Sequence, residues 1–219
     1  MNKKLYFDCE TTGFSSKKNA LIQLAIIIEI DGVIKEEIEF RIKPFIDDEI
    51  DERSLEVHGF SKGDIEKFEE PRCVFNRIIS LLDKYINKFN KEDKFVPCGQ
   101  NVQFDKNFVD MFFRKNGCKY FYSYIGSKDK DVLEIMSWLE DNELIPKLKN
   151  YKLGTIAEHF KIKFKAHDAL EDIKTTYKII KAIDKLITDG KDNGTKRKNI
   201  KKETKKNIAK KVSKKKNKR

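Results

Sequence analysis

The chain has 219 residues, with 47 Lys or Arg against 36 Asp or Glu, and a formal net charge of +11. This length suffices for one domain with a sizeable core, and nothing in the composition indicates two. The apolar run from Leu21 to Ile30 is too short to cross a bilayer, and Asp8 interrupts the apolar run that a signal peptide would need. Four cysteines without Cys-x-x-Cys spacing predict reduced, mostly buried thiols in a soluble, cytoplasmic protein with no membrane partner.

The first predicted element is a buried strand, Leu5 to Phe7, that leads into two acids and a Thr-Thr-Gly turn. Because strand side chains alternate between faces, Asp8 and Glu10 should share one face while Phe7 and Cys9 point into the core. Two carboxylates held this close repel each other, and a divalent cation such as Mg²⁺ or Mn²⁺ relieves the repulsion. Alone, the pattern also fits a strand that ends in two solvated acids.

A hairpin is expected next, because Leu21 to Ile30 and Val33 to Ile42 flank the turn dipeptide Asp31-Gly32. A core-facing helix over Cys73 to Phe89 follows Pro71, with apolar residues at helical spacing. These apolar positions are Phe75, Ile78, Ile79, Leu82, Ile86 and Phe89. Strands followed by helices indicate an α/β fold.

A second acid motif, Gly99 to Asp105, follows the apolar stretch Lys94 to Cys98. The motif contains a Gly-Asn turn and opens an amphipathic segment whose apolar face comprises Phe104, Phe108, Met111 and Phe112. A strand, a turn and a helix in this order place Asp105 in the first helical turn. An acid there also stabilises the helix dipole, by about 0.3 to 1 kcal/mol, without any further role. Two more helices are predicted, over Asp131 to Glu140 and Leu153 to Phe160.

A third motif, His167 to Asp172, opens a long amphipathic segment. Its apolar positions are Leu170, Ile173, Tyr177, Ile180 and Leu186. Asp168 and Glu171 form a capping-box pattern, which engages Asp168 with backbone N–H groups and lets Asp172 project toward a metal. His167 then lies just before the helix, where its ring can face the same cavity as Asp172. A histidine at a helix entrance can also be an ordinary surface or capping residue.

Taken together, the three motifs resemble the DEDDh branch of the DEDD superfamily of 3′-to-5′ exonucleases, which includes the proofreading epsilon subunit of bacterial DNA polymerase III, RNase T and oligoribonuclease. The resemblance covers roughly Lys4 to Leu186, and the His-x-x-x-x-Asp spacing is similar to that of the histidine branch. In the tyrosine branch a tyrosine stands where this chain has Asp168. The resemblance implies a ribonuclease H-like mixed central sheet flanked by helices, in a domain of residues 1–188.

The resemblance also implies a site with two divalent ions, Mg²⁺ or Mn²⁺, about 3.5 to 4 Å apart. Asp8, Glu10, Asp105 and Asp172 would hold the ions, which lower the pKa of an attacking water and stabilise the leaving 3′ oxygen. The imidazole of His167, with an unperturbed pKa of about 6.5, would accept the proton of that water. The substrate contacts implied by the resemblance are Thr11, Thr12, His58, Asn101 and Phe104.

The positive charge is concentrated at the end of the chain. From Lys191 to Arg219 there are fifteen Lys or Arg and two acids, so this segment carries +13 and the remainder 11 − 13 = −2. With few apolar residues, the segment 189–219 is expected to be a disordered tail that binds a phosphate backbone without sequence preference. The alternative is compositional bias, because Lys, Asn and Ile are frequent throughout the chain.

These features predict a metal-dependent 3′-5′ exonuclease that releases nucleoside monophosphates from single-stranded DNA or a frayed DNA 3′ end, in proofreading or repair. Nucleic acid is the expected partner, and a DNA polymerase subunit is a candidate second partner. Two alternatives remain open. One is a 3′-5′ exoribonuclease, which only contacts to the 2′-hydroxyl would distinguish. The other is a non-catalytic nucleic-acid-binding module on the same fold.

Overall fold

A computed structural model of the chain describes residues 1–164 and 169–189. The contacts divide the chain into two units, Met1–Ile179 and a second that begins at Ile180. Residues 180–189 of the second unit are helical. The expected disordered tail lies outside the described residues except for Asp189. Within the described part of the chain, no helix combines the length and apolar character needed to cross a bilayer.

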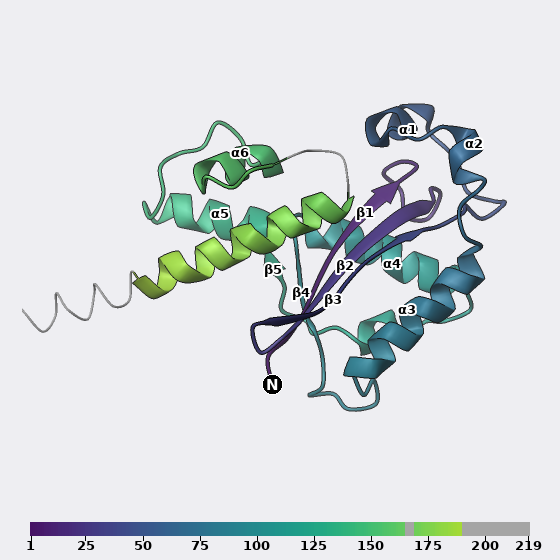
Figure 1. The fold of residues 1–219 in the computed structure, drawn as a ribbon, viewed down its shortest axis with the longest axis horizontal. Helices are drawn as coiled ribbons and strands as arrows, with labels where there is room; N and C mark the ends of the chain where they lie inside the picture. The colour runs from purple at the N-terminus through teal and green to yellow at the C-terminus, as the bar shows by residue number, and fades with distance from the viewer. Residues whose placement is uncertain (165–168, 190–219) are drawn as a thin grey trace, which may run out of the picture. The chain divides into compact units, whose positions relative to one another are not determined.

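The centre of the first unit is a mixed five-stranded sheet with the strand order β3-β2-β1-β4-β5 (Figure 1). Strand β1 pairs antiparallel with β2 and parallel with β4, and it therefore occupies the middle of the sheet. The β2–β3 pair is antiparallel and the β4–β5 pair is parallel. The strands are β1 Lys3–Thr11, β2 Leu21–Ile30, β3 Val33–Arg41, β4 Val96–Gly99 and β5 Lys130–Asp131. This arrangement confirms the predicted α/β fold with a mixed sheet.

The hairpin between β2 and β3 forms where the sequence predicts it. Asp31 and Gly32 both have positive φ angles, 49° and 86°. Two consecutive residues of this conformation characterise the tight turn whose twist matches that of the flanking strands. Strand β3 ends at Arg41, one residue before the predicted end.

Three helices follow the first three strands, later helices follow β4 and β5, and most of the helices lie in the predicted segments. Their bounds are α1 Glu52–His58, α2 Lys62–Ile65, α3 Pro71–Tyr85, α4 Val102–Lys115, α5 Val132–Asp141 and α6 Leu153–His159, followed by a helix over residues 169–189. A 3₁₀ helix covers Phe121–Ser123. The helices α1 and α2 were not predicted, because each is too short to show an apolar repeat.

Helix α3 ends earlier than predicted, and the assignment of Phe89 to the core was wrong. The helix stops at Tyr85, and Ile86 already has extended backbone angles, although its side chain stays buried. Asn87 then forms a local turn, in which its side-chain oxygen accepts the backbone N–H of Phe89 at 3.2 Å. This turn directs Phe89 outward, where 87% of its surface is exposed. Side-chain capping by Asn87 therefore overrides the apolar spacing.

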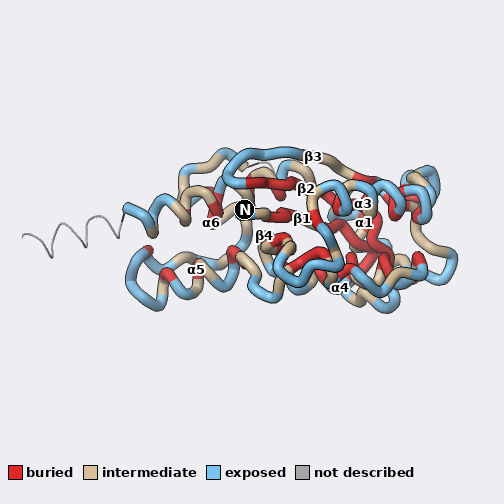
Figure 2. The backbone as a smooth tube through the Cα atoms, turned by 90° about the horizontal axis from the view of Figure 1, so that it is seen from below, coloured by how far each residue is buried: buried red, intermediate tan, exposed pale blue. Residues whose placement is uncertain are grey.

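The main core lies between the sheet and helices α3 and α4. Leu5, Phe7 and Cys9 of β1 point to this side, and they pack with residues such as Phe75 and Phe112 from the two helices. Figure 2 shows the buried residues concentrated in the central strands and on the inner sides of these helices. Full burial of one such aromatic or aliphatic side chain is worth about 1.5 to 3 kcal/mol. The core therefore fixes β1 firmly and turns its alternate residues to the opposite face.

The opposite face of β1 carries Tyr6, Asp8 and Glu10. The ring of Tyr6 makes an edge-to-face contact with Tyr177 at a centroid distance of 5.1 Å, so the helix that includes residues 169–179 packs on this face. This packing brings the first turn of that helix, including Asp172, toward the acids of β1.

A smaller apolar cluster supports α1 and α2. Leu55 and Ile65 from these helices are buried with Ala20 and Ile22 at the start of β2. The backbone N–H of Asp51, the residue before α1, also donates to the carbonyl of Thr12 at 2.9 Å. The end of β1 and helix α1 are therefore held together.

Asp131 ties the turn between β4 and α4 to helix α5. Its carboxylate accepts the backbone N–H groups of Asn101 at 3.0 Å, Val102 at 2.8 Å and Leu133 at 2.9 Å. The residue is 8% exposed. One side chain thus satisfies donors at the beginning of two helices, which the sequence alone did not indicate.

We expect Asp131→Ala to lower the free energy of unfolding by about 2 to 4 kcal/mol, because buried N–H groups lose their acceptor. The matched control is Asp51→Ala, which removes one exposed cap on α1 and should cost about 1 kcal/mol. Urea unfolding followed by circular dichroism measures both values. An equal cost for the two substitutions would refute the bridging role of Asp131.

Candidate metal centre

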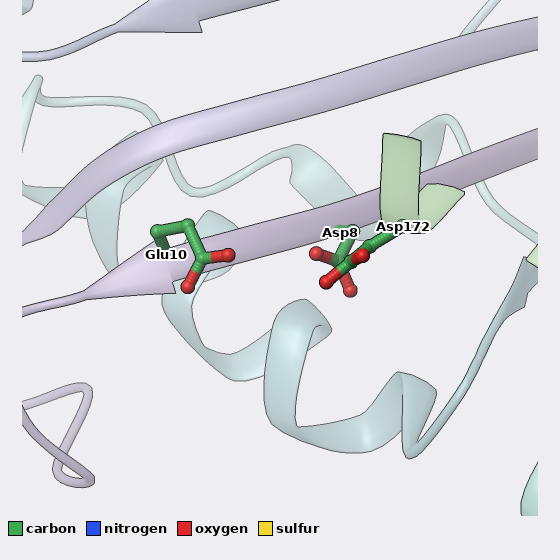
Figure 3. Close-up of side chains that lie close together, drawn as sticks. All are labelled: Asp8, Glu10 and Asp172. Atoms are coloured by element: carbon green, nitrogen blue, oxygen red, sulfur yellow. The ribbon is translucent and has the colours of Figure 1, made fainter. Parts of the chain in front are cut away.

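Three carboxylates from two elements converge at the end of the central strand. Asp8 and Glu10 lie on one face of β1, as alternation predicted, and Asp172 comes from the helix over residues 169–189. One ligand oxygen from each lies within 4.8 Å of the others. Figure 3 shows the carboxylates of Asp8 and Asp172 close together and that of Glu10 farther along the strand. The structure therefore brings together residues 162 or more positions apart in the sequence.

The clustering disfavours ionisation of Asp8. Burial raises the pKa of Asp8 well above its ordinary value, and the neighbouring charges of Asp105, Glu10 and Asp172 raise that pKa further. The protein thus holds the carboxylates together at an electrostatic cost. A bound cation would remove this cost by neutralising the repulsion.

Asp105 lies beside the three-residue cluster rather than within it. As predicted, it occupies the first turn of α4, and it is 3% exposed. Strand β4 pairs with β1 only as far as Tyr6, and beyond that point Asp105 accepts the backbone N–H of Cys9 at 3.1 Å. Burial raises the pKa of Asp105 well above its ordinary value, although hydrogen bonds from Cys9 act in the opposite direction. Asp105 thereby continues the hydrogen bonding of β1 where β4 has ended.

His58 contacts one of the acids directly. It is the last residue of α1, and its Nδ1 lies 2.5 Å from Oε2 of Glu10. Both side chains are mostly buried. The family resemblance implied His58 as a substrate contact, but it did not indicate the contact with Glu10. Only the folded position of α1 above the end of β1 makes this contact visible (Figure 1).

The other residues expected to contact a substrate have different surroundings. Thr12 is fully buried, and its hydroxyl donates to the carbonyl of Glu49 at 2.8 Å and accepts the N–H of Ala20 at 2.8 Å. The hydroxyl of Thr11 donates to the carbonyl of Gly13 at 2.7 Å. The threonine hydroxyls therefore hold the turn after β1.

Asn101 and Phe104 flank the beginning of α4. Asn101 is exposed and adopts the left-handed conformation, with a φ angle of 60°. Phe104 is partly buried, and its ring lies 4.9 Å from that of Phe108. His167 and Asp168 lie outside the described residues. The roles assigned to these positions as substrate contacts, proton acceptor and helix cap stay predictions.

The fold defines a class, that of proteins with a ribonuclease H-like sheet. Escherichia coli exonuclease I in complex with a dT13 oligonucleotide superimposes with a TM-score of 0.72 at 20% sequence identity. The match covers 88% of this chain and 43% of that protein. This likeness confirms the predicted ribonuclease H-like fold.

The chain belongs to the RNase T family of exonucleases, whose family model matches residues 5–180. A PolC-type DNA polymerase III from Lacticaseibacillus paracasei is 28% identical over 188 residues, which cover 82% of this chain and 11% of the polymerase. Ribonuclease T from Buchnera aphidicola is 29% identical over 130 residues, which cover 54% of this chain and 58% of that enzyme. The chain thus spans about a tenth of the polymerase. Membership confirms the resemblance that the three motifs indicated.

The residues present fit a divalent cation. The family uses divalent metal ions, and the three converging groups are all oxygen donors, which suit hard cations. Burial and the charges of its acidic neighbours raise the pKa of Asp8, so positive charge near this group would favour its ionised form. A cation between these oxygens would supply that charge.

The raised pKa of Asp8 predicts the direction of a stability change. Between the ordinary pKa of an aspartate, about 3.9, and the raised pKa in the folded protein, the folded state binds more protons than the unfolded state. Stability contributed by protonated Asp8 is therefore lost as the pH rises through this range. In metal-free buffer at pH 8, we expect Asp8→Asn to raise the free energy of unfolding, on the order of 1 kcal/mol.

Thermal unfolding at pH 4 and pH 8 in the presence of a chelator measures this effect, which should shrink at pH 4. Glu66→Gln is the matched control, because Glu66 is exposed and distant in sequence from the cluster, and it should change little at either pH. A less stable Asp8→Asn variant at pH 8 would contradict the electrostatic account.

Proposed function

We propose that the protein is a metal-dependent 3′-5′ exonuclease that releases nucleoside monophosphates from the 3′ end of single-stranded DNA or of a frayed DNA duplex. The convergence of Asp8, Glu10 and Asp172 within 4.8 Å is the observation that carries this proposal. Bringing three carboxylates together does not stabilise the fold, because their mutual repulsion costs free energy. Membership of an exonuclease family supports the same conclusion.

In the proposed site, Asp8, Glu10, Asp105 and Asp172 hold two ions, Mg²⁺ or Mn²⁺. Such ions, when bound, stabilise negative charge on the phosphate and lower the pKa of a water. Asp8 and Asp172 are adjacent and suit a shared position, and Glu10 extends the cluster along β1. Asp105 is held by the N–H of Cys9, which bonds one of its two carboxylate oxygens. His167, five residues before Asp172, would accept the proton of the attacking water.

DNA is the proposed substrate because two similar proteins are associated with DNA. The polymerase relative is named for DNA synthesis, and exonuclease I was solved with a DNA oligonucleotide. RNA is the second candidate, because ribonuclease T is an equally similar relative by sequence identity. A DNA polymerase is a proposed partner on the basis of the PolC-type relative alone.

The basic segment from Lys191 to Arg219 is proposed to strengthen binding to the phosphate backbone, because it carries +13. All four cysteines are free thiols, of which Cys9 and Cys98 are buried. Free thiols fit a reducing compartment, and the cytoplasm is the proposed location.

We expect Asp8→Ala to abolish nucleotide release, because the shared ligand position is lost, and His167→Ala to lower turnover by roughly 10² to 10⁴. Release of the 3′-terminal nucleotide from a labelled oligonucleotide with Mg²⁺ or Mn²⁺ measures both. Glu66→Gln serves as the control and should retain activity. Undiminished activity of the Asp8→Ala variant would refute the proposal.

The same assay distinguishes the candidate substrates. Matched single-stranded DNA, duplex DNA with a mismatched 3′ end and RNA should be degraded at different rates, with DNA preferred. Preference for RNA would favour the exoribonuclease. Stabilisation by Mn²⁺ without cleavage of any of the three would identify a binding module that retains metal.

Removal of the residues after Gly190 should weaken substrate affinity at low salt and leave turnover at saturating substrate unchanged, because the tail supplies electrostatic attraction rather than chemistry. Affinity measured from 50 to 200 mM salt tests this expectation. An unchanged salt dependence would refute a role of the tail in binding.

A further inference from the structure

Five exposed lysines gather on the segment between α5 and the helix over residues 169–189. They are Lys147, Lys149, Lys152, Lys161 and Lys163, and we call them the lysine track. The described part of this segment, residues 142–164, contains two acids, Glu143 and Glu158, so its net charge is +3. The body of the chain without the basic tail carries −2. This stretch of 23 residues therefore has a positive net charge within a body whose net charge is slightly negative.

Many lysines elsewhere in the described chain are paired with acids, whereas most of the lysine track is not. Lysines such as Lys3, Lys84 and Lys115 form ion pairs with nearby acids. Within the track, Lys149 lies 3.8 Å from Glu158, and both are well exposed. No acid among the described residues lies within ion-pair distance of Lys152, Lys161 or Lys163. The positive charges of these three ammonium groups are therefore not neutralised by a described acid.

Hydrogen bonds connect the lysine track to the proposed catalytic end of the molecule. Gln100, in the turn that leads into α4 and Asp105, donates to the carbonyl of Tyr151 at 2.7 Å. The hydroxyl of Tyr151 donates to Glu140 at 2.7 Å, which fixes the segment on the end of α5. Lys152 therefore directly follows a residue held by the turn that positions Asp105.

The two halves of the track are packed against each other. A Cβ atom at Gly154 in α6 would lie 3.1 Å from the ring of Phe164, so the ring packs closely against the backbone of this glycine. Lys163 precedes Phe164, and Lys152 precedes α6. Helices α5 and α6 lie toward one end of the sheet, and α1 and α3 lie toward the other (Figures 1 and 2). The segment that carries the track therefore lies toward the end of the sheet that is away from α1 and α3.

We propose that the lysine track binds the phosphate backbone of the substrate strand, on the nucleotides that precede the 3′-terminal one. This proposal rests on the proposed function, because it assigns the path by which a strand leaves the carboxylate cluster. Flexible ammonium groups are point charges that suit phosphates along a strand without sequence preference. The carboxylate cluster itself repels a polyanion, so attraction must come from outside it.

The test compares the full-length protein with a triple variant, Lys152→Gln, Lys161→Gln and Lys163→Gln. Binding of a fifteen-nucleotide oligo-dT and of a dinucleotide is measured in chelator from 50 to 200 mM salt. Each lost phosphate contact should lower the salt slope by about 0.7, hence by about 2 for three. The wild-type protein should then lose about 20-fold more affinity for the long strand over this range than the variant. Dinucleotide affinity should not change.

The matched control neutralises Lys35, Lys91 and Lys119, which are also exposed and lie outside any ion pair among the described residues. It should keep the wild-type slope for the long strand. An equal slope for all three proteins would overturn the lysine track, and so would an equal loss in the control variant. Binding of poly-glutamate that depends on the track, with unchanged binding of oligo-dT, would identify an acidic protein as the partner and overturn the proposal as stated.

The outcomes separate the track from the catalytic proposal. Binding is measured without divalent ions, so it does not depend on hydrolysis. A wild-type protein that degrades a short oligonucleotide but shows no slope difference would contradict only the lysine track. An inactive wild-type protein that shows the difference would contradict the proposed function and retain the track as a nucleic-acid surface.

Discussion

The repulsion among buried carboxylates at the end of β1 is the constraint around which this molecule is organised. Asp8 sits beside three other acids, and both burial and their charges raise its pKa. Such an arrangement persists only if the surrounding structure is firm enough to hold it. The central position of β1, with an apolar face packed on α3 and α4, provides that firmness. Stability is thus given up locally to hold several negative charges close together.

Two of the acids are held by contacts with other parts of the fold. Asp105 is oriented by the N–H of Cys9 where β4 has stopped, and Glu10 is contacted by His58 from α1. Asp131 fixes the turn before α4 and links it to α5. A change in any of these supports would alter the relative positions of the oxygens, even without touching the acids. The proposed chemistry therefore depends on residues that no acid motif contains.

Local patterns predicted much of this arrangement, and tertiary contacts account for the rest. Alternation placed Asp8 and Glu10 on one face, the Asp31-Gly32 dipeptide predicted the hairpin, and apolar spacing located α4 with Asp105 in its first turn. The contact of His58 with Glu10 could not be foreseen, because α1 is too short for a periodic signal and its position depends on a small separate cluster. The prediction that Phe89 lies in the core was wrong, because Asn87 forms a local turn after α3 and the apolar repeat ends there.

The most direct test of the central claim is the anomalous scattering of manganese in crystals of the full-length protein soaked with Mn²⁺. The account predicts anomalous density between the oxygens of Asp8, Glu10 and Asp172, with Asp105 oriented toward it. Acids that remain in place with no manganese among them, at concentrations that saturate any thermal shift, would contradict it.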